Sequence, residues 1–433
     1  MAADMTIRLT GIDVDQNKLT YQTQIGAALT SYFSGGSFTI EYPITLTDIP
    51  ASVLAVPFVG TMLPIAWLTG AEIVVPELDQ AFYDCIPRVV GGYGVIYPNA
   101  ALKGSVRADR LVKNDSPGDS AAALFSGGVD SFDTLLTHYG EQPRMLAIWG
   151  ADVEYDNRRG WDEVERLLQS TSALLKLPYD VIRTSFRTFD NYFTLSRLSE
   201  PLLGSNYWYG LSSSISMLSH TAPLAYARGI GTLYIAASNS RRMDDLMGYD
   251  PCASNPFSDN EVRFAGCRVV HDGYEKIRQE KIENIVDICT QKIGRPAPVR
   301  VCYLSDDGHN CCRCEKCYRT IAGFLAAGAS PEDYGFPYSI RLMAQMEPFL
   351  LQDRSMFDTT VKTDWWAIPE RMRKVKHPSK SLRRYWPYVK WVRDVDFEHP
   401  EKLRVPLRTK CVIFACDRYD DLKALRRKVS RSK

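Results

Sequence analysis

A six-residue segment at positions 126–131, Ser-Gly-Gly-Val-Asp-Ser, contains the residue types that bind phosphate. It follows the apolar run Ala121–Phe125 and precedes a helical pattern. Two glycines let the backbone turn tightly beside a ligand, and the first amides of the helix then face an anion. The hydroxyls of Ser126 and Ser131 add donors, and the carboxylate of Asp130 can hold Mg2+. The pattern predicts a phosphate-binding loop that differs from Walker A, because no Gly-Lys-Ser/Thr follows. An ordinary strand-to-helix turn is the alternative.

Four cysteines have the spacing of a tetrahedral zinc site. Cys311, Cys314 and Cys317 are separated by two residues each, and Cys302 lies shortly upstream. Four thiolates fill the coordination sphere of Zn2+ and leave no position for water, so this spacing predicts a structural zinc rather than a catalytic one. Cys312 is a fifth candidate, but its side chain is expected to point away if Cys311 and Cys314 both bind. A set of redox-active or merely buried thiols is the alternative.

The glycine-containing loop resembles the PP-loop of the N-type ATP pyrophosphatases, which have an adenine-nucleotide α-hydrolase-like fold. Enzymes of that superfamily use the loop to hold the pyrophosphate of ATP while a substrate oxygen is adenylated. The resemblance implies a site for pyrophosphate and Mg2+ made by Ser126, Gly127, Gly128, Val129, Asp130 and Ser131. From strand order alone, it also places Trp149, at the end of the second strand, beside adenine.

The cysteine segment is similar to the zinc-binding tail of the 7-cyano-7-deazaguanine synthase (QueC) family. In that family a Cys-Tyr pair precedes Cys-Gly-x-Cys-x-x-Cys and a Gly-aromatic step. Here Cys302-Tyr303 and Gly323-Phe324 match the outer parts, and Cys312 replaces the glycine. That replacement is tolerable if the backbone at Cys312 is not left-handed. The resemblance covers residues 121–328 and is anchored by a motif at each end.

Two segments depart from the family pattern. Trp149–Asp152 stands where a Tyr-Gly-Gln-like signature is usual, and Leu211–Ile215 stands where a Gly-Arg-Asn segment is usual. Both positions contact the substrate or the nucleotide in the family, so the identity of the substrate is left open. In length and build the chain resembles the longer QueC-like proteins of bacterial anti-phage operons.

The resemblance implies an ATP-dependent ligase that forms a carbon–nitrogen bond. A carboxylate or amide of the 7-deazaguanine class would be adenylated with release of pyrophosphate, and ammonia or an amine would then displace AMP. ATP, Mg2+ and Zn2+ are the implied cofactors. Two other functions stay open, namely a PP-loop enzyme that thiolates RNA and a non-catalytic adaptor in which ATP or zinc only maintains the fold.

Further candidate groups lie after the fourth predicted strand. Arg278 and Lys281 are three positions apart, so they share one face of a predicted helix. They could neutralise the triphosphate as charge develops, or they could form a solvated basic face. For His271-Asp272, a helix-capping role of Asp272 is preferred over a catalytic dyad.

Strand-length apolar runs alternate with helical patterns through the middle of the chain. This alternation predicts an α/β fold with a doubly wound parallel sheet of Rossmann type. The predicted strands are Ala121–Phe125, Met145–Trp149, Asp180–Arg183, Thr232–Ala236 and Val299–Tyr303, preceded by shorter runs at Thr6–Leu9, Phe38–Tyr42 and Tyr93–Tyr97.

Composition divides the chain into three expected parts. We expect an N-terminal α+β domain over 1–115, a PP-loop domain with its zinc site over 116–330, and a mixed, basic and aromatic region over 331–433. The stretch Ile49–Ala71 is uncharged and long enough to span a membrane, but three prolines break its helical hydrogen bonding. It is therefore predicted to form two short helices in the core, and no membrane association is expected.

The charge of the chain is unevenly distributed. The 433 residues carry a net charge of only +1 and are 45% hydrophobic, which excludes a largely disordered chain and a polycation. Residues 371–433, however, hold 20 Lys and Arg against 7 Asp and Glu, a local charge of +13. The basic residues include Arg383, Arg384, Lys390, Arg393, Arg404, Arg408 and Arg426–Lys428, and they lie among Tyr385, Trp386, Tyr388 and Trp391.

A basic and aromatic region of this kind predicts a docking surface for a protein partner or a second copy of the chain. Single-stranded RNA, which also needs cations and stacking rings, is the less favoured alternative. The N-terminal residues lack the apolar run of a signal peptide, and the clustered cysteines suggest metal rather than disulfides. A cytoplasmic location is therefore expected.

Overall fold

The structure is a computed structural model, and it divides into two compact units, 1–276 and 277–433. It describes residues 4–115, 118–302, 304–305, 308–339, 345–347, 349–351, 359–375, 380–397, 399, 411 and 418. The division differs from the three parts expected from composition, because strands from residues 1–115 and strands after residue 120 belong to one sheet. Each unit is described by itself.

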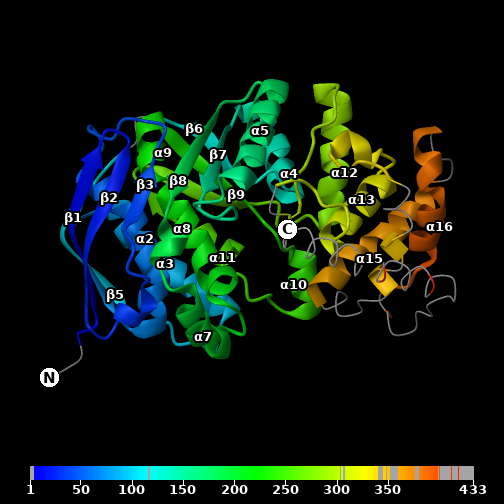
Figure 1. Ribbon diagram of the computed structural model, residues 1–433. Coiled ribbons are helices and arrows are strands. Elements are labelled where there is room, and N and C mark those ends of the chain that lie inside the picture. The colour runs from blue at the N-terminus through cyan, green and yellow to red at the C-terminus, as the bar shows by residue number, and fades with distance from the viewer. Residues whose placement is uncertain are drawn as a thin grey trace, which may run out of the picture. The chain divides into compact units, whose positions relative to one another are not determined.

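Unit 1 is built on a single eleven-stranded sheet, and its strands β1, β2 and β3 lie at the left of Figure 1. The strand order is β10-β11-β9-β6-β7-β8-β3-β2-β1-β4-β5. The strands are β1 (Thr6–Asp15), β2 (Lys18–Ile25), β3 (Phe38–Glu41), β4 (Glu72–Asp79), β5 (Ser105–Val112), β6 (Ser120–Leu124), β7 (Arg144–Trp149), β8 (Tyr179–Thr184), β9 (Ile230–Ala236), β10 (Arg263–Phe264) and β11 (Cys267–Asp272).

Five parallel strands form the part of the sheet that carries the glycine-containing loop. Strand β6 pairs in parallel with β7 on one side and β9 on the other, β8 lies beyond β7, and β11 lies beyond β9. Residues 121–123 and 145–147 are buried without alternation, as expected where both faces of a sheet are covered. The predicted α/β class with a large, mostly parallel sheet is confirmed, and four of its predicted strands are β6 to β9.

The N-terminal residues extend this sheet beyond β8. Strand β3 pairs antiparallel with β8, with Ile40 opposite Thr184, and β2 and β1 follow as an antiparallel pair. In β2, buried Leu19 and Tyr21 alternate with more exposed residues, so this part of the sheet packs mainly through one face. Beyond β1, strands β4 and β5 are again parallel.

Helices connect and cover these strands. They are α1 (Ala51–Leu54), α2 (Val56–Thr69), α3 (Gln80–Ile96), α4 (Val129–Thr137), α5 (Arg158–Leu175), α6 (Phe186–Phe189), α7 (Tyr192–Leu203), the π-helical turn η3 (Trp208–Ser212), α8 (Ser213–His220), α9 (Ala222–Arg228), α10 (Arg241–Met247) and α11 (Pro256–Asp259).

The predicted core segment at 49–71 forms α1 and α2, and both helices are buried as expected. The stretch Ala51–Thr69 is long and apolar enough to cross a membrane by length and composition, yet 89% of its most apolar window is buried inside the protein. Gly60 lies where α2 meets α8, and a Cβ there would be 2.2 Å from the hydroxyl oxygen of Ser219.

Two predicted strands are wrong. Tyr93–Tyr97 belongs to the end of α3, where Gly92 permits a close approach: a Cβ there would lie 2.3 Å from the carbonyl oxygen of Phe257. Residues 299–302 form no strand, because the side chain of Asn310 rather than a neighbouring strand bonds their backbone. Strand β11, which the sequence reading missed, occupies the fifth parallel position instead.

Unit 2 is helical in its described residues. It contains α12 (Arg278–Ile288), the π-helical turn η4 (Cys289–Ile293), α13 (Glu315–Ala326), η5 (Pro331–Tyr334), α15 (Thr359–Lys374), η7 (Lys380–Tyr385) and α16 (Trp386–Asp394). Helix α13 packs on α12, and a Cβ at Gly323 would lie 2.5 Å from the Cδ1 atom of Ile282. Buried Trp365 of α15 donates a hydrogen bond to Glu315 of α13 over 2.7 Å.

In the described part of the basic C-terminal region, some of the aromatic side chains are buried. Tyr385 and Tyr388 are buried, whereas Arg383, Arg384 and Lys390 are exposed. The other basic residues of the predicted docking surface, Arg404, Arg408 and Arg426–Lys428, lie outside the described residues.

The last residue of β11 and the segment that follows it anchor helix α4. Asp272 accepts hydrogen bonds from the hydroxyl of Thr134 at 2.8 Å and from Nε2 of His138 at 3.0 Å. The ammonium of Lys276 lies 2.7 Å from the carboxylate of Asp133, which is fully buried. Asp272 is therefore not the cap of α12 that was expected, because its carboxylate is engaged with α4.

These contacts shift two pKa values in opposite directions. The hydrogen bond to Asp272 raises the pKa of His138, and burial opposes this only in part. Burial raises the pKa of Asp272, but the hydrogen bonds from His138 and Thr134 outweigh it and lower the pKa overall. The charged pair is therefore favoured in the folded protein.

We expect His138→Gln to reduce the free energy of unfolding by about 1–3 kcal/mol near pH 6, the usual worth of a hydrogen bond to a charged group. Because its pKa is raised on folding, His138 stabilises the fold below its unfolded pKa of about 6.5, and this stabilisation is lost as pH rises through the folded value. The contribution of Asp272 is lost in acid instead. Urea unfolding at pH 6 and pH 9 tests this, and an equal loss at both pH values would contradict it.

Candidate functional site

The loop at 126–131 joins β6 to α4 through a left-handed glycine. Gly127 has φ +79°, a conformation that favours glycine, and Gly128 is the N-cap of α4 with extended backbone angles. The hydroxyl of Ser131 donates to the carbonyl of Gly128 over 3.1 Å and lies 3.3 Å from the hydroxyl of exposed Ser126. With glycine as N-cap, no side chain caps the helix. The structure thus brings the predicted loop residues together around the start of α4.

The loop leaves β6 where the strand order of the sheet reverses. From β6 the chain moves to β7 and β8 on one side, and later to β9 and β11 on the other. In open α/β sheets, ligands bind beyond the carboxyl ends of the strands at such a reversal. Asp130, half-buried, is the acidic residue in the first turn of α4. The position and the helix terminus together suit an anion with an associated cation.

Trp149 ends β7 at the same edge of the sheet but is covered by protein. Its indole is 6% exposed, stacks on Trp161 at 5.0 Å between centroids, and lies 4.4 Å from the guanidinium carbon of Arg183. Little of the ring surface therefore remains for a nucleobase. Contact between Trp149 and adenine stays a prediction.

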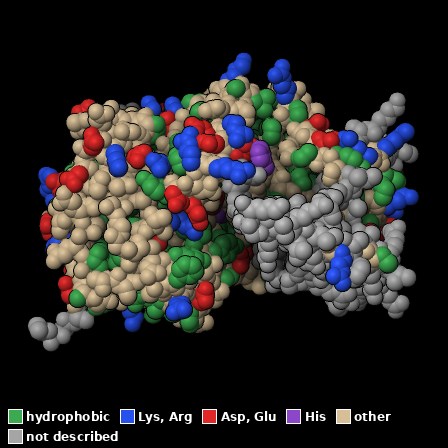
Figure 2. Space-filling view, in the orientation of Figure 1, with side chains coloured by type: hydrophobic (Ala, Val, Ile, Leu, Met, Phe, Trp, Pro, Cys, Tyr) green, Lys and Arg blue, Asp and Glu red, His purple; other side chains and the backbone are tan. Residues whose placement is uncertain are grey.

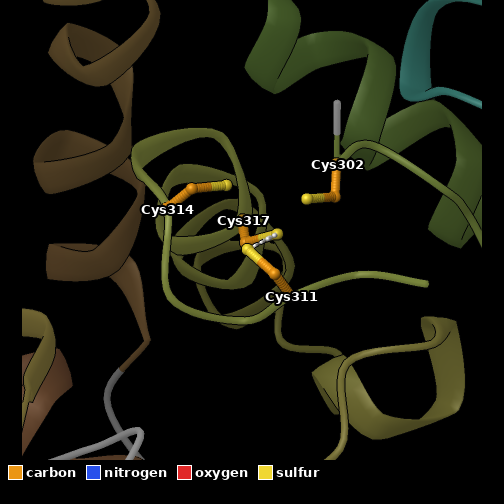
Figure 3. Close-up of side chains that lie close together, drawn as sticks. All are labelled: Cys302, Cys311, Cys314 and Cys317. Carbon is orange, nitrogen blue, oxygen red and sulfur yellow. Dashed lines mark hydrogen bonds between the residues drawn. The ribbon is translucent and has the colours of Figure 1, made fainter. Parts of the chain in front are cut away.

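Four cysteines of unit 2 form a cluster with the dimensions of a zinc site. The sulfur atoms of Cys302, Cys311, Cys314 and Cys317 all lie within 4.8 Å of one another, and Figure 3 shows them turned toward a common centre. The Cys311 and Cys317 sulfurs are 3.9 Å apart. Tetrahedral Zn–S bonds of about 2.3 Å require about 3.8 Å between sulfurs, so the four cysteines could bind a zinc ion.

Helix α13 and Asn310 position the four cysteines. Cys314 is the N-cap of α13 and Cys317 lies in its first turn, where the positive end of the helix dipole favours thiolates. The side-chain oxygen of Asn310 accepts from the backbone amides of Val301 at 2.9 Å and Cys302 at 3.3 Å. Its amide group donates to the carbonyl of Val299 at 2.8 Å. Asn310 thus ties the segment that ends at Cys302 to the loop of Cys311, a role that the cysteine spacing alone did not reveal.

The thiols of the cluster also affect one another's ionisation. Hydrogen bonds from the thiols of Cys314 and Cys317 lower the pKa of Cys311, because the first thiolate to form is stabilised by its neighbours. Further thiolates would repel it, and a divalent cation would offset that repulsion. With four sulfur ligands the site has no open position, so its chemistry suits a structural role.

The backbone at Cys312 is left-handed, the conformation in which a cysteine was expected to replace glycine poorly. Its φ is +51°, in the left-handed region that a residue with a Cβ enters at a cost. Cys312 is not part of the four-cysteine group, and burial raises the pKa of its thiol to about 12. The replacement of glycine by Cys312 is therefore strained.

Arg278 and Lys281 belong to unit 2 and do not form a solvated basic face. Both are buried, with exposures of 8% and 2%, and the guanidinium of Arg278 donates to the hydroxyl of Thr320 over 3.3 Å. Their proposed contact with a triphosphate stays a prediction.

Two buried polar groups of unit 1 were not anticipated. His271 pairs through Nδ1 with Asp259 at 2.9 Å, rather than with its neighbour Asp272, and Ser254 donates to the same carboxylate. Asp190, after α6, is 8% exposed beside buried Tyr207. Neither group has a sequence signal, because the burial of both is set by packing within unit 1 rather than by a local motif.

A comparison of the chain with protein-family models, with curated proteins and with solved structures finds no match. The geometry of the loop and of the cysteine cluster is therefore what bears on the function of the chain.

We expect the purified protein to contain about one zinc ion per chain. Cys314→Ser is expected to lose the metal and to unfold at lower temperature, because binding of a structural zinc contributes directly to folding. Cys312→Ser is the matched control and is expected to keep the metal. Elemental analysis and thermal unfolding measure both effects. Zinc-free wild-type protein, or equal zinc loss in the two variants, would show that the site is assigned wrongly.

Cys312→Gly is expected to stabilise the protein by about 1 kcal/mol, since glycine adopts a positive φ without the Cβ clash. Zinc content is expected to stay unchanged. Chemical unfolding of the zinc-loaded protein measures the difference, with Cys312→Ala as the control that keeps a Cβ. If glycine gives no more stability than alanine, the backbone at this position is not strained.

Proposed function

We propose that the chain is an ATP-dependent ligase of the PP-loop type, which adenylates a small carboxylate or amide and joins it to nitrogen. The observation that carries this proposal is the loop Ser126–Ser131, placed by β6 at the reversal of strand order. The loop resembles the pyrophosphate-binding loop of that superfamily. The cysteine segment is similar to that of the 7-cyano-7-deazaguanine synthase family, which supports a substrate of the 7-deazaguanine class. We include in this proposal that the parallel part of the sheet has the adenine-nucleotide α-hydrolase-like fold.

In the proposed reaction an oxygen of the substrate attacks the α-phosphorus of ATP. The bond to the bridging oxygen of the β-phosphate breaks, and pyrophosphate leaves. The backbone amides at the start of α4 and the hydroxyls of Ser126 and Ser131 would hold the departing phosphates. Asp130 would hold Mg2+, which offsets their negative charge. A nitrogen nucleophile then attacks the activated carbon, AMP leaves with the oxygen, and the nitrogen gives up a proton.

The cysteines of unit 1 favour ligation over RNA thiolation. A thiolating enzyme needs an accessible cysteine that can carry a persulfide. Cys85, Cys252 and Cys267 are the cysteines in the described residues of unit 1, and each is at most 5% exposed. Burial raises their pKa values to about 11, 12 and 12. None is therefore a reactive thiolate.

The displayed surface of unit 1 does not favour RNA binding either. On the face that Figure 2 displays, Lys and Arg side chains of unit 1 lie among Asp and Glu side chains, so this face is not uniformly basic. For the basic C-terminal region we retain the proposal of a protein partner or a second copy. Its exposed cations Arg383 and Lys390 would face the acidic groups of that partner, whereas Arg384 already pairs with Glu332.

We expect full-length protein with Mg2+, ATP and the right substrate to release pyrophosphate and AMP, and Asp130→Asn to reduce turnover at least 100-fold, in the range typical for loss of a charge-stabilising group. The reason is that the neutral side chain holds Mg2+ poorly beside the phosphates. Chromatography of the nucleotide products and a coupled pyrophosphate assay measure the effect.

Asp109→Asn, on the exposed edge strand β5, is the matched control and is expected to keep full activity. The thermal unfolding midpoint of Asp130→Asn without nucleotide is expected to stay near that of the wild type. ADP and orthophosphate as products would rule out adenylation.

A further inference from the structure

Strand β5 (Ser105–Val112) forms an open edge of the sheet in unit 1. Within the part of the chain that the structure describes, it is the last strand of the sheet and pairs with β4 alone. It has eight residues, whereas β10, at the other end of the sheet, has two. The unpaired backbone groups of a long edge strand can bind another strand, so this edge is a candidate interaction surface.

The backbone groups on the open side of β5 belong to alternate residues. The amide of Ser105 donates to the carbonyl of Ala71 over 3.1 Å, and the register between β4 and β5 then stays constant along the strand. Because the backbone groups of successive residues point to opposite sides of a strand, those of Val106, Ala108 and Arg110 point away from β4. In the described residues, none of these three forms a backbone hydrogen bond on that open side.

The open side ends before the last residue of the strand. The carbonyl of Val112 accepts a hydrogen bond from the side chain of Asn114 over 3.1 Å. The segment that can pair with another strand is therefore 106–110.

A second copy of β5 fits this segment. Two identical strands that pair antiparallel across a twofold axis place one residue opposite itself, and the residues on either side then pair in order. With Ala108 at the centre, Val106 lies opposite Arg110 of the second copy, so the outward backbone groups of 106, 108 and 110 all form hydrogen bonds. Arg107 then lies opposite Asp109 of the second copy.

Charge selects this register. Centring the pair on Arg107, on Asp109 or on Arg110 would place like charges opposite each other, which destabilises a strand pair. Centring it on Val106 would pair only residues 105–107 within the strand. With Ala108 at the centre, opposite charges meet instead. Arg107 and Asp109 are exposed and lie 3.0 Å apart in one chain, so a second copy would extend this pair into a row of four alternating charges.

The remaining charge of the segment does not oppose the pairing. Arg110 forms an ion pair with Glu77 of β4 in its own chain, so its charge is already offset where it would face Val106 of the second copy. Charged residues protect many edge strands from pairing, but they exclude a second copy only where like charges meet. The edge of β5 is therefore open to a copy of itself.

We propose that two copies of the chain form a symmetric dimer in which their β5 strands pair antiparallel, centred on Ala108, and join the two sheets. This surface belongs to unit 1 and is separate from the basic C-terminal region. Strand β5 lies seven strands from β6, or roughly 34 Å along the sheet at the usual strand spacing. Dimer formation is therefore expected to leave the loop 126–131 unchanged, and it does not depend on the proposed function.

The test uses the full-length protein in analytical ultracentrifugation. Over about a hundredfold range of protein concentration, mass action is expected to shift the wild type from monomer to dimer. Asp109→Arg, which places arginines opposite each other, is expected to raise the dissociation constant of the dimer at least about tenfold. The double variant Arg107→Asp/Asp109→Arg exchanges the charges and is expected to restore the dimer. A wild type that stays monomeric throughout, or a double variant that associates no better than Asp109→Arg, would overturn the proposal.

A proline tests the backbone contribution independently of charge. Ala108→Pro removes an N–H that faces outward and is not bonded within its own chain, and proline is tolerated on edge strands at such positions. This variant is expected to unfold near the wild-type midpoint and to be monomeric. Lys390→Glu, in the basic C-terminal region, is the matched control and is expected to keep the dimer. A dimer that persists in Ala108→Pro, or is lost in Lys390→Glu, would place the interface elsewhere. Should Ala108→Pro fail to fold, the charge variants decide alone.

Discussion

Strand β6 is hydrogen-bonded to a parallel neighbour on each side, and this double pairing determines where the rest of unit 1 can place a ligand. Because β7 and β9 lead to opposite ends of the sheet, the chain leaving β6 is not covered by a strand connection at that point. Gly127 makes the turn, and α4 begins with its amides directed past the sheet edge. The ion pairs of α4 with Asp272 and Lys276 then hold the helix, and with it the loop, in a fixed orientation.

Unit 2 depends on a different kind of constraint. Four thiols from two separate segments converge at the start of α13, and Asn310 holds those segments together through backbone hydrogen bonds. The same segment contains a strained residue, Cys312, in left-handed backbone. Strain of this size persists only where the surrounding structure fixes the backbone, and Cys312 lies between Cys311 and Cys314 of the cluster.

Features that depend on the spacing of nearby residues could be predicted from the sequence. Features that depend on contacts between distant residues could not. The cysteine cluster and the strand–loop–helix around Ser126–Ser131 follow from residues close together in the chain. Strand β11 was missed because its buried residues Cys267, Val269 and His271 alternate with exposed ones and include a polar side chain. The burial of Asp190 has no local pattern, since its exposure is set by packing across unit 1.

The pairing of β3 with β8 bears on the order in which the chain can fold during synthesis. The backbone amide of Thr39 bonds to the hydroxyl of Ser185, 146 positions later, so the first strands reach their sheet neighbour only after much of unit 1 has left the ribosome. Pairings between such distant segments form slowly, because the long intervening chain must first be brought together. Until then the edge of β3 that pairs with β8 stays unpaired, whereas β1, β2 and β3 can already pair with one another. An unpaired strand edge can pair with another chain, which makes this edge a site of possible aggregation during synthesis.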